Sequence, residues 1–337
     1  MAEPDSAVGA PESTATEIGS ASGAASASDT TMATAAIATT TDFDRDTAVR
    51  VLVRSERDGH PSGAELAADV SPDWRAGRGP HGGYLAAMML RALIVTVDDA
   101  TRAPRSLTIH YARAPLPGAV TIRTTIERAG RSLSTLSARI EQDGTLVALA
   151  LAAFSPAWSA PEIADLPMPD VAPPDPQRRS GKLLFEGAPP FTQHLVLQPR
   201  IGVIPFQGAS APMDVGAWLG LAEPRPLDAL SLAFLSDAMF SPPFIRIDHP
   251  ATSPTIDLTI HFRAALPTYG AAAPAGTAGR SGVAAAAGDA DELCFARFRS
   301  GRVHEGFFEE DGVIWSADGT LLAQSRQLAI LMLLEKR

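Results

Sequence analysis

An acidic side chain within an apolar stretch is the first feature that could perform chemistry. Asp237 is flanked by Phe234, Leu235, Ala238 and Met239. A carboxylate among such residues must be paired, hydrogen-bonded or shifted in pKa. It could therefore orient and activate a water molecule for attack on a substrate. The alternative is a carboxylate that turns to the surface or caps a strand.

Two adjacent glycines, Gly82 and Gly83, stand where another apolar helix is expected to begin. Glycines in a first helical turn leave backbone N–H groups uncovered, and the helix dipole adds about half a positive charge there. A carbonyl oxygen that becomes an oxyanion could be stabilised at this point, an effect of about 10²- to 10³-fold for one donor. The alternative is a tight turn that needs only small residues. His81 could contact the substrate, cap the helix or simply bond to the backbone.

A repeated phrase reveals the elements that would position these groups. Residues 107–117 read LTIHYARAPLP and residues 258–267 read LTIHFRAALP, an offset of 258 − 107 = 151 positions. Each copy follows a predicted apolar helix, at residues 82–95 and 227–240, and precedes alternating, β-branched runs. Strands are predicted at residues 106–113, 119–129, 132–142 and 145–154, and again at 193–206, 254–266, 292–300, 303–309 and 320–331. The recurrence of the phrase in the same flanking order indicates a duplicated fold unit.

Each unit is expected to hold one helix and several antiparallel strands. A helix that is apolar all round must be buried, and a curved sheet wrapped around it achieves this. The predicted fold class is therefore α+β, a double hot-dog. We expect a disordered tail at residues 1–42, an N-terminal hot-dog at 43–158, a Pro-rich linker at 159–190 and a C-terminal hot-dog at 191–337. The last would contain a disordered Ala/Gly insert at 268–291.

Several motifs resemble one family in their order and spacing. Residues 74–87, with the pattern W-x-x-G-x-G-P-H-G-G-Y-L-A-A, look like the helix entry of the thioesterase-like double hot-dog proteins. Ser236-Asp237, Thr255-Ile256-Asp257 and the run from Asp318-Gly319 to Gln327 resemble the second half of TesB-type acyl-CoA thioesterase II. The resemblance covers roughly residues 43–333, apart from the linker and the insert.

This resemblance implies a hydrolase that cleaves acyl-CoA thioesters to a carboxylic acid and free CoA. In such enzymes an Asp, a Thr and a Gln jointly hold the attacking water, which carries over to Asp237, Thr255 and Gln327. Gly82, Gly83 and His81 would bind the substrate and its oxyanion. Asp257, two residues after Thr255 and so expected on its sheet face, is a reserve candidate for the acid.

The two halves differ in a way that predicts a single shared site. The first helix has the Gly-Gly pair but carries Leu90 where a single-domain relative would have its carboxylate, seven residues after Gly83. The second has Asp237 but Ala229 and Leu230 at its entry. Paired hot-dogs build their sites across the interface, so one tip and one acid would meet there. The acyl chain would then lie between the helices, along Met88, Met89, Leu235 and Met239.

One other function stays open, a hot-dog that binds acyl thioesters without hydrolysing them, because Leu328 and Ala329 follow Gln327 where the bacterial enzymes have an acid and a glycine. Enoyl hydration is disfavoured, since no histidine follows Asp237 closely. A covalent Ser-His-Asp mechanism is also disfavoured, because no Gly-x-Ser-x-Gly elbow is present.

Composition and charge limit the kinds of binding partner that the chain is expected to have. The formal charge is −10 with no basic cluster, which argues against a nucleic-acid partner. The single cysteine, Cys294, fits a reducing compartment. No apolar stretch reaches the roughly 18 to 20 residues that span a bilayer, so no stable membrane insertion is expected. We expect no cofactor and no metal, and assign His110 and His261 of the repeated phrase to packing. An acyl-CoA substrate, further pairing into a homo-oligomer and a cytoplasmic location are expected, with a peroxisomal one left open.

Overall fold

The two copies of the repeated phrase lie on neighbouring strands that pair with each other. Strand β5 (Ala103–Tyr111) runs antiparallel to β12 (Thr255–Phe262), with Thr108 opposite Thr259. The two hydroxyls lie 3.1 Å apart. Because corresponding residues of the two copies face each other across an antiparallel pair, a local two-fold axis passes through this point. The duplicated units are therefore joined into one sheet at the repeated phrase.

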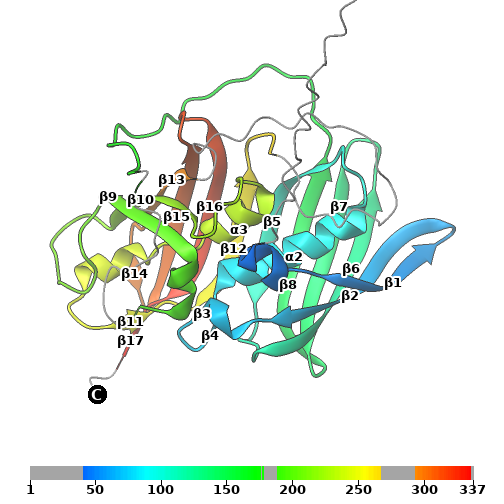
Figure 1. Cartoon of the computed structure of the whole chain (residues 1–337), viewed down its shortest axis with the longest axis horizontal. Coiled ribbons are helices and arrows are strands. Elements are labelled where there is room, and N and C mark those ends of the chain that lie inside the picture. The colour runs from blue at the N-terminus through cyan, green and yellow to red at the C-terminus, as the bar shows by residue number, and fades with distance from the viewer. Residues whose placement is uncertain (1–40, 176, 178–187, 267–292, 335–337) are drawn as a thin grey trace, which may run out of the picture. The chain divides into compact units, whose positions relative to one another are not determined.

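The computed structural model describes residues 41–175, 177, 188–266 and 293–334. The predicted Ala/Gly insert and the predicted tail, apart from its last two residues, lie outside the described residues. Its main sheet has the strand order β1-β2-β6-β7-β8-β5-β12-β16-β15-β13-β10-β9, and Figure 1 shows β5 and β12 at its middle. The other first-half strands are β1 (Arg50–Arg57), β2 (His60–Val70), β6 (Gly118–Ala129), β7 (Ser134–Gln142) and β8 (Thr145–Ser155). Those of the second half are β9 (Leu195–Ile201), β10 (Asp214–Leu221), β13 (Cys294–Arg299), β15 (Phe307–Ser316) and β16 (Leu321–Ile330). The α+β double hot-dog prediction is confirmed.

Short elements complete the fold. Strands β3 (Arg75–Ala76) and β4 (Gly79–Pro80) pair with each other, as do β11 (Ala251–Thr252) and β17 (Met332–Leu333), while β14 (Val303–His304) pairs with β15. The short helices are α1 (Asp42–Asp46) and three 3₁₀ turns, η1 (Pro72–Trp74), η2 (Pro190–His194) and η3 (Pro242–Arg246).

Two apolar helices lie against the same side of the sheet and pack against each other (Figure 1). Helix α2 (Gly82–Val97) is buried over nearly its whole length, and every residue of α3 (Ala229–Leu235) is buried. Helix α3 begins at a capping box, in which the side chain of Asp228 accepts from the Ser231 N–H and the Ser231 hydroxyl accepts from the Asp228 N–H. It ends earlier than predicted, at Leu235. Asp237 therefore lies in the turn after the helix and not within it.

Strand β15 differs most from the prediction. A strand was predicted to end at residue 309, but β15 continues to Ser316 in register with β16. Gly312 is needed for close packing, because a Cβ there would lie 2.2 Å from the Ser325 hydroxyl and 2.7 Å from the Phe298 ring. Strand β10 was not predicted. The continuation of β15 brings Glu310 to an inward position.

The Pro-rich segment after the first unit is extended and anchored along the sheet. Residues 156–175 form no regular secondary structure. The indole N–H groups of Trp218 and Trp315 donate to the carbonyls of Ala172 and Leu166, at 2.9 and 3.0 Å. Both tryptophans lie in a small cluster separate from the main core, on the face of the sheet opposite the helices. The segment therefore covers apolar surface that the sheet would otherwise leave to water. The predicted domain limits stay a prediction.

Candidate active site

The Asp237 carboxylate lies at the N-terminal tip of the other unit's helix. Its Oδ2 accepts the Gly83 N–H at 2.8 Å, and only 11% of its side chain is exposed. A carboxylate is stabilised at this end of a helix by the uncovered N–H groups and the dipole. The acid from the second unit and the glycine pair from the first unit therefore meet where α3 ends against α2.

The two glycines are required by the closeness of this contact. A Cβ on Gly82 would lie 2.7 Å from Asp237 Oδ2. A Cβ on Gly83 would lie 2.4 Å from the backbone oxygen of Phe234, which cannot turn away. Sequence analysis expected the N–H groups here to face a substrate oxygen. In the structure the Gly83 N–H is already used by Asp237.

His81 fixes the chain around the acid from the other side. Its Nε2 lies 2.8 Å from the Asp237 carbonyl oxygen and 3.6 Å from Oδ2. A carbonyl only accepts, so Nε2 carries the proton and Nδ1 the lone pair of a neutral ring. Burial lowers the pKa of His81, although Asp237 opposes this. Among the described residues, the buried Nδ1 has no hydrogen-bond partner.

Tyr111 is a further polar group at this tip that sequence analysis did not single out. Its hydroxyl donates to the Gly82 carbonyl at 2.8 Å. Burial, and then the charge of Asp237, raise the pKa of Tyr111 well above its usual value, so it stays a neutral donor. The signal was present in the repeated phrase, because Tyr111 corresponds to Phe262 in the second copy. The hydroxyl is present only in the first copy, and it bonds the polar tip of α2 in the same unit.

Thr255 and Gln327 come together on neighbouring strands, β12 and β16. The Thr255 hydroxyl donates to Gln327 Oε1 at 2.7 Å. The Gln327 amide lies close enough to the Asp237 carboxylate to lower its pKa. The three residues that the resemblance assigned to the attacking water are therefore linked through Gln327.

A β-bulge decides which way Thr255 faces. Thr255 pairs with Ala329, yet Asp257 pairs with Leu328, so one extra residue lies on β12. This shift reverses the alternation of side chains, and Thr255 points inward with the buried Gln327. Asp257 lies on the opposite face with Thr259, so the expectation that it shares the face of Thr255 was wrong.

A second carboxyl, Glu310 on β15, completes the polar cluster. It lies directly opposite Gln327 in the β15–β16 pair, and Gln327 Nε2 donates to Glu310 Oε1 at 2.6 Å. Its side chain is 4% exposed. Burial raises the pKa of Glu310 to about 8, with Asp237 adding to the rise and Gln327 opposing it. No motif pointed to this residue, and the predicted strand ended one position before it, at residue 309.

Burial is also the largest influence on Asp237. It raises the pKa of Asp237 above 3.8, against the opposing effects of His81, the Gly83 N–H and Gln327. A carboxylate that is costly to ionise is a better proton acceptor than one in water. The arrangement can therefore take a proton from a bound water molecule.

The tip of α3 is occupied differently from the tip of α2. The Arg225 guanidinium donates to both oxygens of Asp228 at 2.8 and 2.7 Å and to both oxygens of Asp44 at 3.0 Å. Arg91, next to Leu90 on α2, also donates to Asp44, at 2.9 Å. Asp228, Arg225 and Arg91 are all nearly fully buried. A closed ion network thus fills the place where a symmetric pair of units would have a second site.

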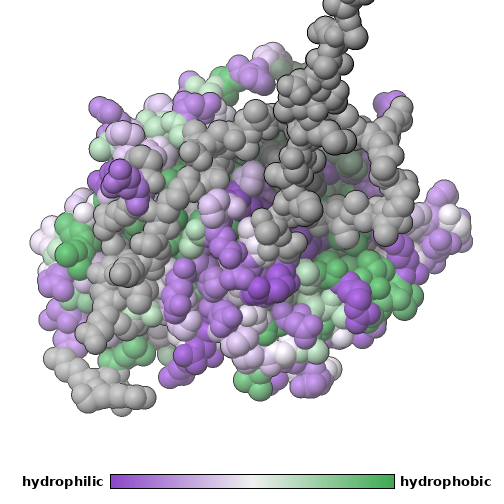
Figure 2. Space-filling model, in the orientation of Figure 1, coloured by the Kyte–Doolittle hydropathy of each residue, from purple (hydrophilic) through white to green (hydrophobic). Residues whose placement is uncertain are grey.

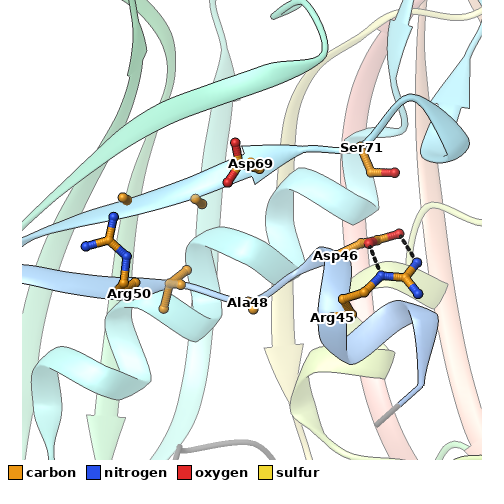
Figure 3. Close-up of a pocket in the computed structure, with 9 residues that line it drawn as sticks. Arg45, Asp46, Ala48, Arg50, Asp69 and Ser71 are labelled. Carbon is orange, nitrogen blue, oxygen red and sulfur yellow. Dashed lines mark hydrogen bonds and ion pairs between the residues drawn. The ribbon is translucent and has the colours of Figure 1, made fainter.

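One surface hollow lies away from this polar cluster. A cavity of about 380 Å³ is lined by α1, β1 and the end of β2, including Arg45, Arg50 and Asp69. Figure 3 shows Arg45 turned onto Asp46, which pairs with it. Charge is balanced there and neither helix tip contributes, so the cavity does not suggest chemistry.

The part of the chain that the structure describes lacks two other features. No group of three or more His, Cys, Asp or Glu residues there could hold a metal ion. None of its helices is both long and apolar enough to cross a membrane. His110 and His261, expected to pack, are both exposed on the face opposite the helices.

Comparison with protein families places the chain. Residues 70–155 match the acyl-CoA thioesterase N-terminal domain, and residues 165–331 match the acyl-CoA thioesterase C-terminal domain. The chain belongs to the acyl-CoA thioesterase family. An uncharacterized protein of Mycobacterium tuberculosis (strain H37Rv) is 22% identical over 302 residues, which cover 81% of this thioesterase-family chain and 93% of the relative.

Solved structures share the fold. A hot-dog protein of unknown function from Alicyclobacillus acidocaldarius matches with a TM-score of 0.69 at 22% identity, covering 87% of this chain and 98% of that one. A putative thioesterase II from Thermobifida fusca matches with a TM-score of 0.65 at 22% identity and with the same coverage. An acyl-CoA thioesterase II, TesB2, from Mycobacterium marinum matches with a TM-score of 0.60 at 18% identity, covering 88% of this chain and 98% of that one. The resemblance to TesB-type double hot-dog proteins is thereby confirmed at the level of family and fold.

Proposed function

We propose that this family member hydrolyses acyl-CoA thioesters to a carboxylic acid and free CoA. One observation carries the proposal: the buried Asp237 carboxylate lies 2.8 Å from the N–H of Gly83, at the tip of the helix from the other unit. A proton acceptor and a positive helix end thus lie side by side, and only 11% of the acceptor side chain is exposed. Both accelerate the attack of a bound water molecule on a thioester.

The steps balance without a cofactor. A water molecule bound by Asp237, Thr255 and Gln327 attacks the thioester carbonyl carbon while Asp237 takes one of its protons. The carbonyl oxygen becomes an oxyanion that faces the α2 N-terminus, where Gly82 supplies the neighbouring N–H and the dipole adds positive charge. The intermediate then collapses, the C–S bond breaks, and the proton held by Asp237 passes to the departing thiolate.

Each polar group has a task that matches its chemistry. The Thr255 hydroxyl, which donates to Gln327, can also accept from water. The Gln327 amide joins Thr255 to Asp237. His81 holds the Asp237 backbone through Nε2 and turns a lone pair on Nδ1 toward the buried interior. The acyl chain would follow the apolar seam between α2 and α3, where Met88, Met89, Leu235 and Met239 are buried.

The test is thiol release from a panel of acyl-CoAs of increasing chain length, followed with a thiol reagent. We expect release by the native chain, and a loss of at least tenfold in Thr255→Val. Asp257→Asn is the matched control for a polar change on the same strand, since Asp257 lies on the opposite face, and it should retain activity. Binding of acyl-CoA without thiol release would favour the non-hydrolytic alternative. A panel with neither binding nor release would reject both.

A further inference from the structure

Glu310 is a buried carboxyl that the proposed steps do not use. It lies opposite Gln327 on the neighbouring strand and accepts the Gln327 amide N–H at 2.6 Å. Gln327 Oε1 is bound at the same time by the Thr255 hydroxyl, at 2.7 Å. With both ends of the amide engaged, the side chain cannot flip without losing two buried hydrogen bonds.

The surroundings of Glu310 favour its uncharged form. Gln327 bonds it from β16. The charge of Asp237, in the turn after α3, is near enough to raise the pKa of Glu310, and His81 Nε2 lies 3.6 Å from that carboxylate. On its own strand, Asp311 points to the other face and pairs there with Arg326. Among the described residues no salt bridge reaches Glu310. A proton on Glu310 is therefore favoured by burial and by the nearby Asp237.

We propose that Glu310 is a positioning residue of this thioesterase site that works in its uncharged form, fixing the Gln327 amide between Thr255 and Asp237 and switching the site off when it ionises. The inference rests on the proposed function. Two carboxyl groups with one amide between them can carry one negative charge at modest cost, and that charge belongs on Asp237. A second charge on Glu310 would repel both the attacking water as it becomes hydroxide-like and the developing oxyanion.

The expected signature is a fall in activity on the alkaline side. Burial raises the pKa of Glu310 to about 8, so kcat should decline as the pH rises through this region. Glu310→Gln keeps an oxygen for the Gln327 amide and cannot ionise. Its kcat at pH 7 should lie within about threefold of the native value, and the alkaline decline should disappear. Glu310→Ala removes the acceptor and should lose at least tenfold in kcat at every pH, with KM little changed.

The experiment measures kcat and KM of native protein, Glu310→Gln, Glu310→Ala and Glu309→Gln between pH 6 and 10. Glu309 is the matched control, since it is the same residue type one position away and bonds the Gly301 N–H on the other face. The proposal is overturned if Glu310→Gln keeps the alkaline decline, if the native protein has none, or if Glu310→Gln loses as much activity as Glu310→Ala. A merely structural role would not move the pH profile.

A second measurement separates this inference from the proposed function. Carbon-13 NMR of glutamate side-chain carboxyls should show one signal that titrates near pH 8 and is missing in Glu310→Gln. If the native protein releases no thiol from any acyl-CoA, the proposed function fails, and the NMR titration still decides whether Glu310 is the uncharged group described here. If thiol is released but no such signal is found, the Glu310 inference alone fails.

Discussion

Replacing Asp237 by asparagine separates the chemical role of this residue from its structural one. An asparagine oxygen can still accept the Gly83 N–H that Asp237 Oδ2 accepts at 2.8 Å. The side chain keeps its size, but it can neither carry a charge nor take a proton from water. Loss of a general base is worth about 10²- to 10⁴-fold in rate, and we expect kcat to fall within this range.

Stability should change in the opposite direction, or not at all. Burial raises the pKa of Asp237 above 3.8 in the folded chain, so at neutral pH the ionised side chain costs folding free energy. Asparagine removes this cost. The advantage of the variant in free energy of unfolding should therefore be absent well below pH 3.8 and grow as the pH rises above it.

The assay combines thiol release from the best acyl-CoA of the panel with thermal unfolding of the same samples. Asp257→Asn serves as the control, because Asp257 is an aspartate on the opposite face of the sheet. A variant that keeps activity within threefold of the native protein would remove Asp237 from the reaction. A variant that is inactive and also unfolds well below the native temperature would make Asp237 a structural residue.

Three further predictions concern the elements around the site. In Gly83→Ala the new Cβ would lie 2.4 Å from the backbone oxygen of Phe234, so the free energy of unfolding should fall by about 1–3 kcal/mol. The control Gly301→Ala meets only a flexible side chain and should change this free energy little. An unchanged urea midpoint for Gly83→Ala would contradict the close contact. Removing Arg225 leaves the buried Asp228 without its cation and should lower the free energy of unfolding by about 3–5 kcal/mol. Arg326→Ala, at an exposed ion pair, should lower it by less than about 1 kcal/mol. Equal losses in denaturant titrations would refute the buried network. The pKa of Glu310 is raised from 4.5 to about 8, so its contribution to stability is complete below pH 4.5 and is lost as the pH rises to about 8. Relative to Glu310→Gln, the free energy of unfolding of the native protein should decline over this window by up to about 5 kcal/mol. Parallel pH curves for the two proteins would contradict the raised pKa.

The architecture could be predicted from the sequence because the chain contains two copies of one fold unit. A phrase repeated at a fixed offset indicates two like units, and its alternating apolar residues indicate a strand buried on one side. In the structure the two copies are neighbours, with Thr108 opposite Thr259. Asp237 could be selected on physical grounds alone, since a carboxylate in an apolar stretch needs a partner.

Other parts of the site depend on single-residue shifts that no pattern indicates. One bulge residue on β12 decides that Thr255 and not Asp257 faces inward. Gly312 is a packing requirement within β15. That strand places Glu310 beside Gln327, but the predicted strand ended one residue earlier, at 309, so the sequence did not reveal this member of the cluster. The helix end at Leu235 depends on how α3 meets the tip of α2, which is a contact between distant segments.

Surface chemistry offered little additional guidance. The face seen in Figure 2 mixes hydrophilic and hydrophobic residues. Apolar side chains such as Leu52, Val53 and Leu151 are exposed on β1 and β8, which is ordinary for isolated positions. The site is instead marked by what is buried: two carboxyls, an amide and a histidine at one helix tip.

The central claim is that two units build one thioester site per chain, because the second tip is filled by Arg225 and its partners. Its most direct test is the stoichiometry with which the protein binds a non-hydrolysable thioether analogue of acyl-CoA, measured by isothermal titration calorimetry. The account predicts one analogue bound per chain, with binding weakened in Gly82→Ala, whose Cβ would lie 2.7 Å from Asp237 Oδ2. Two analogues bound per chain, or one bound with unchanged affinity in Gly82→Ala, would contradict it.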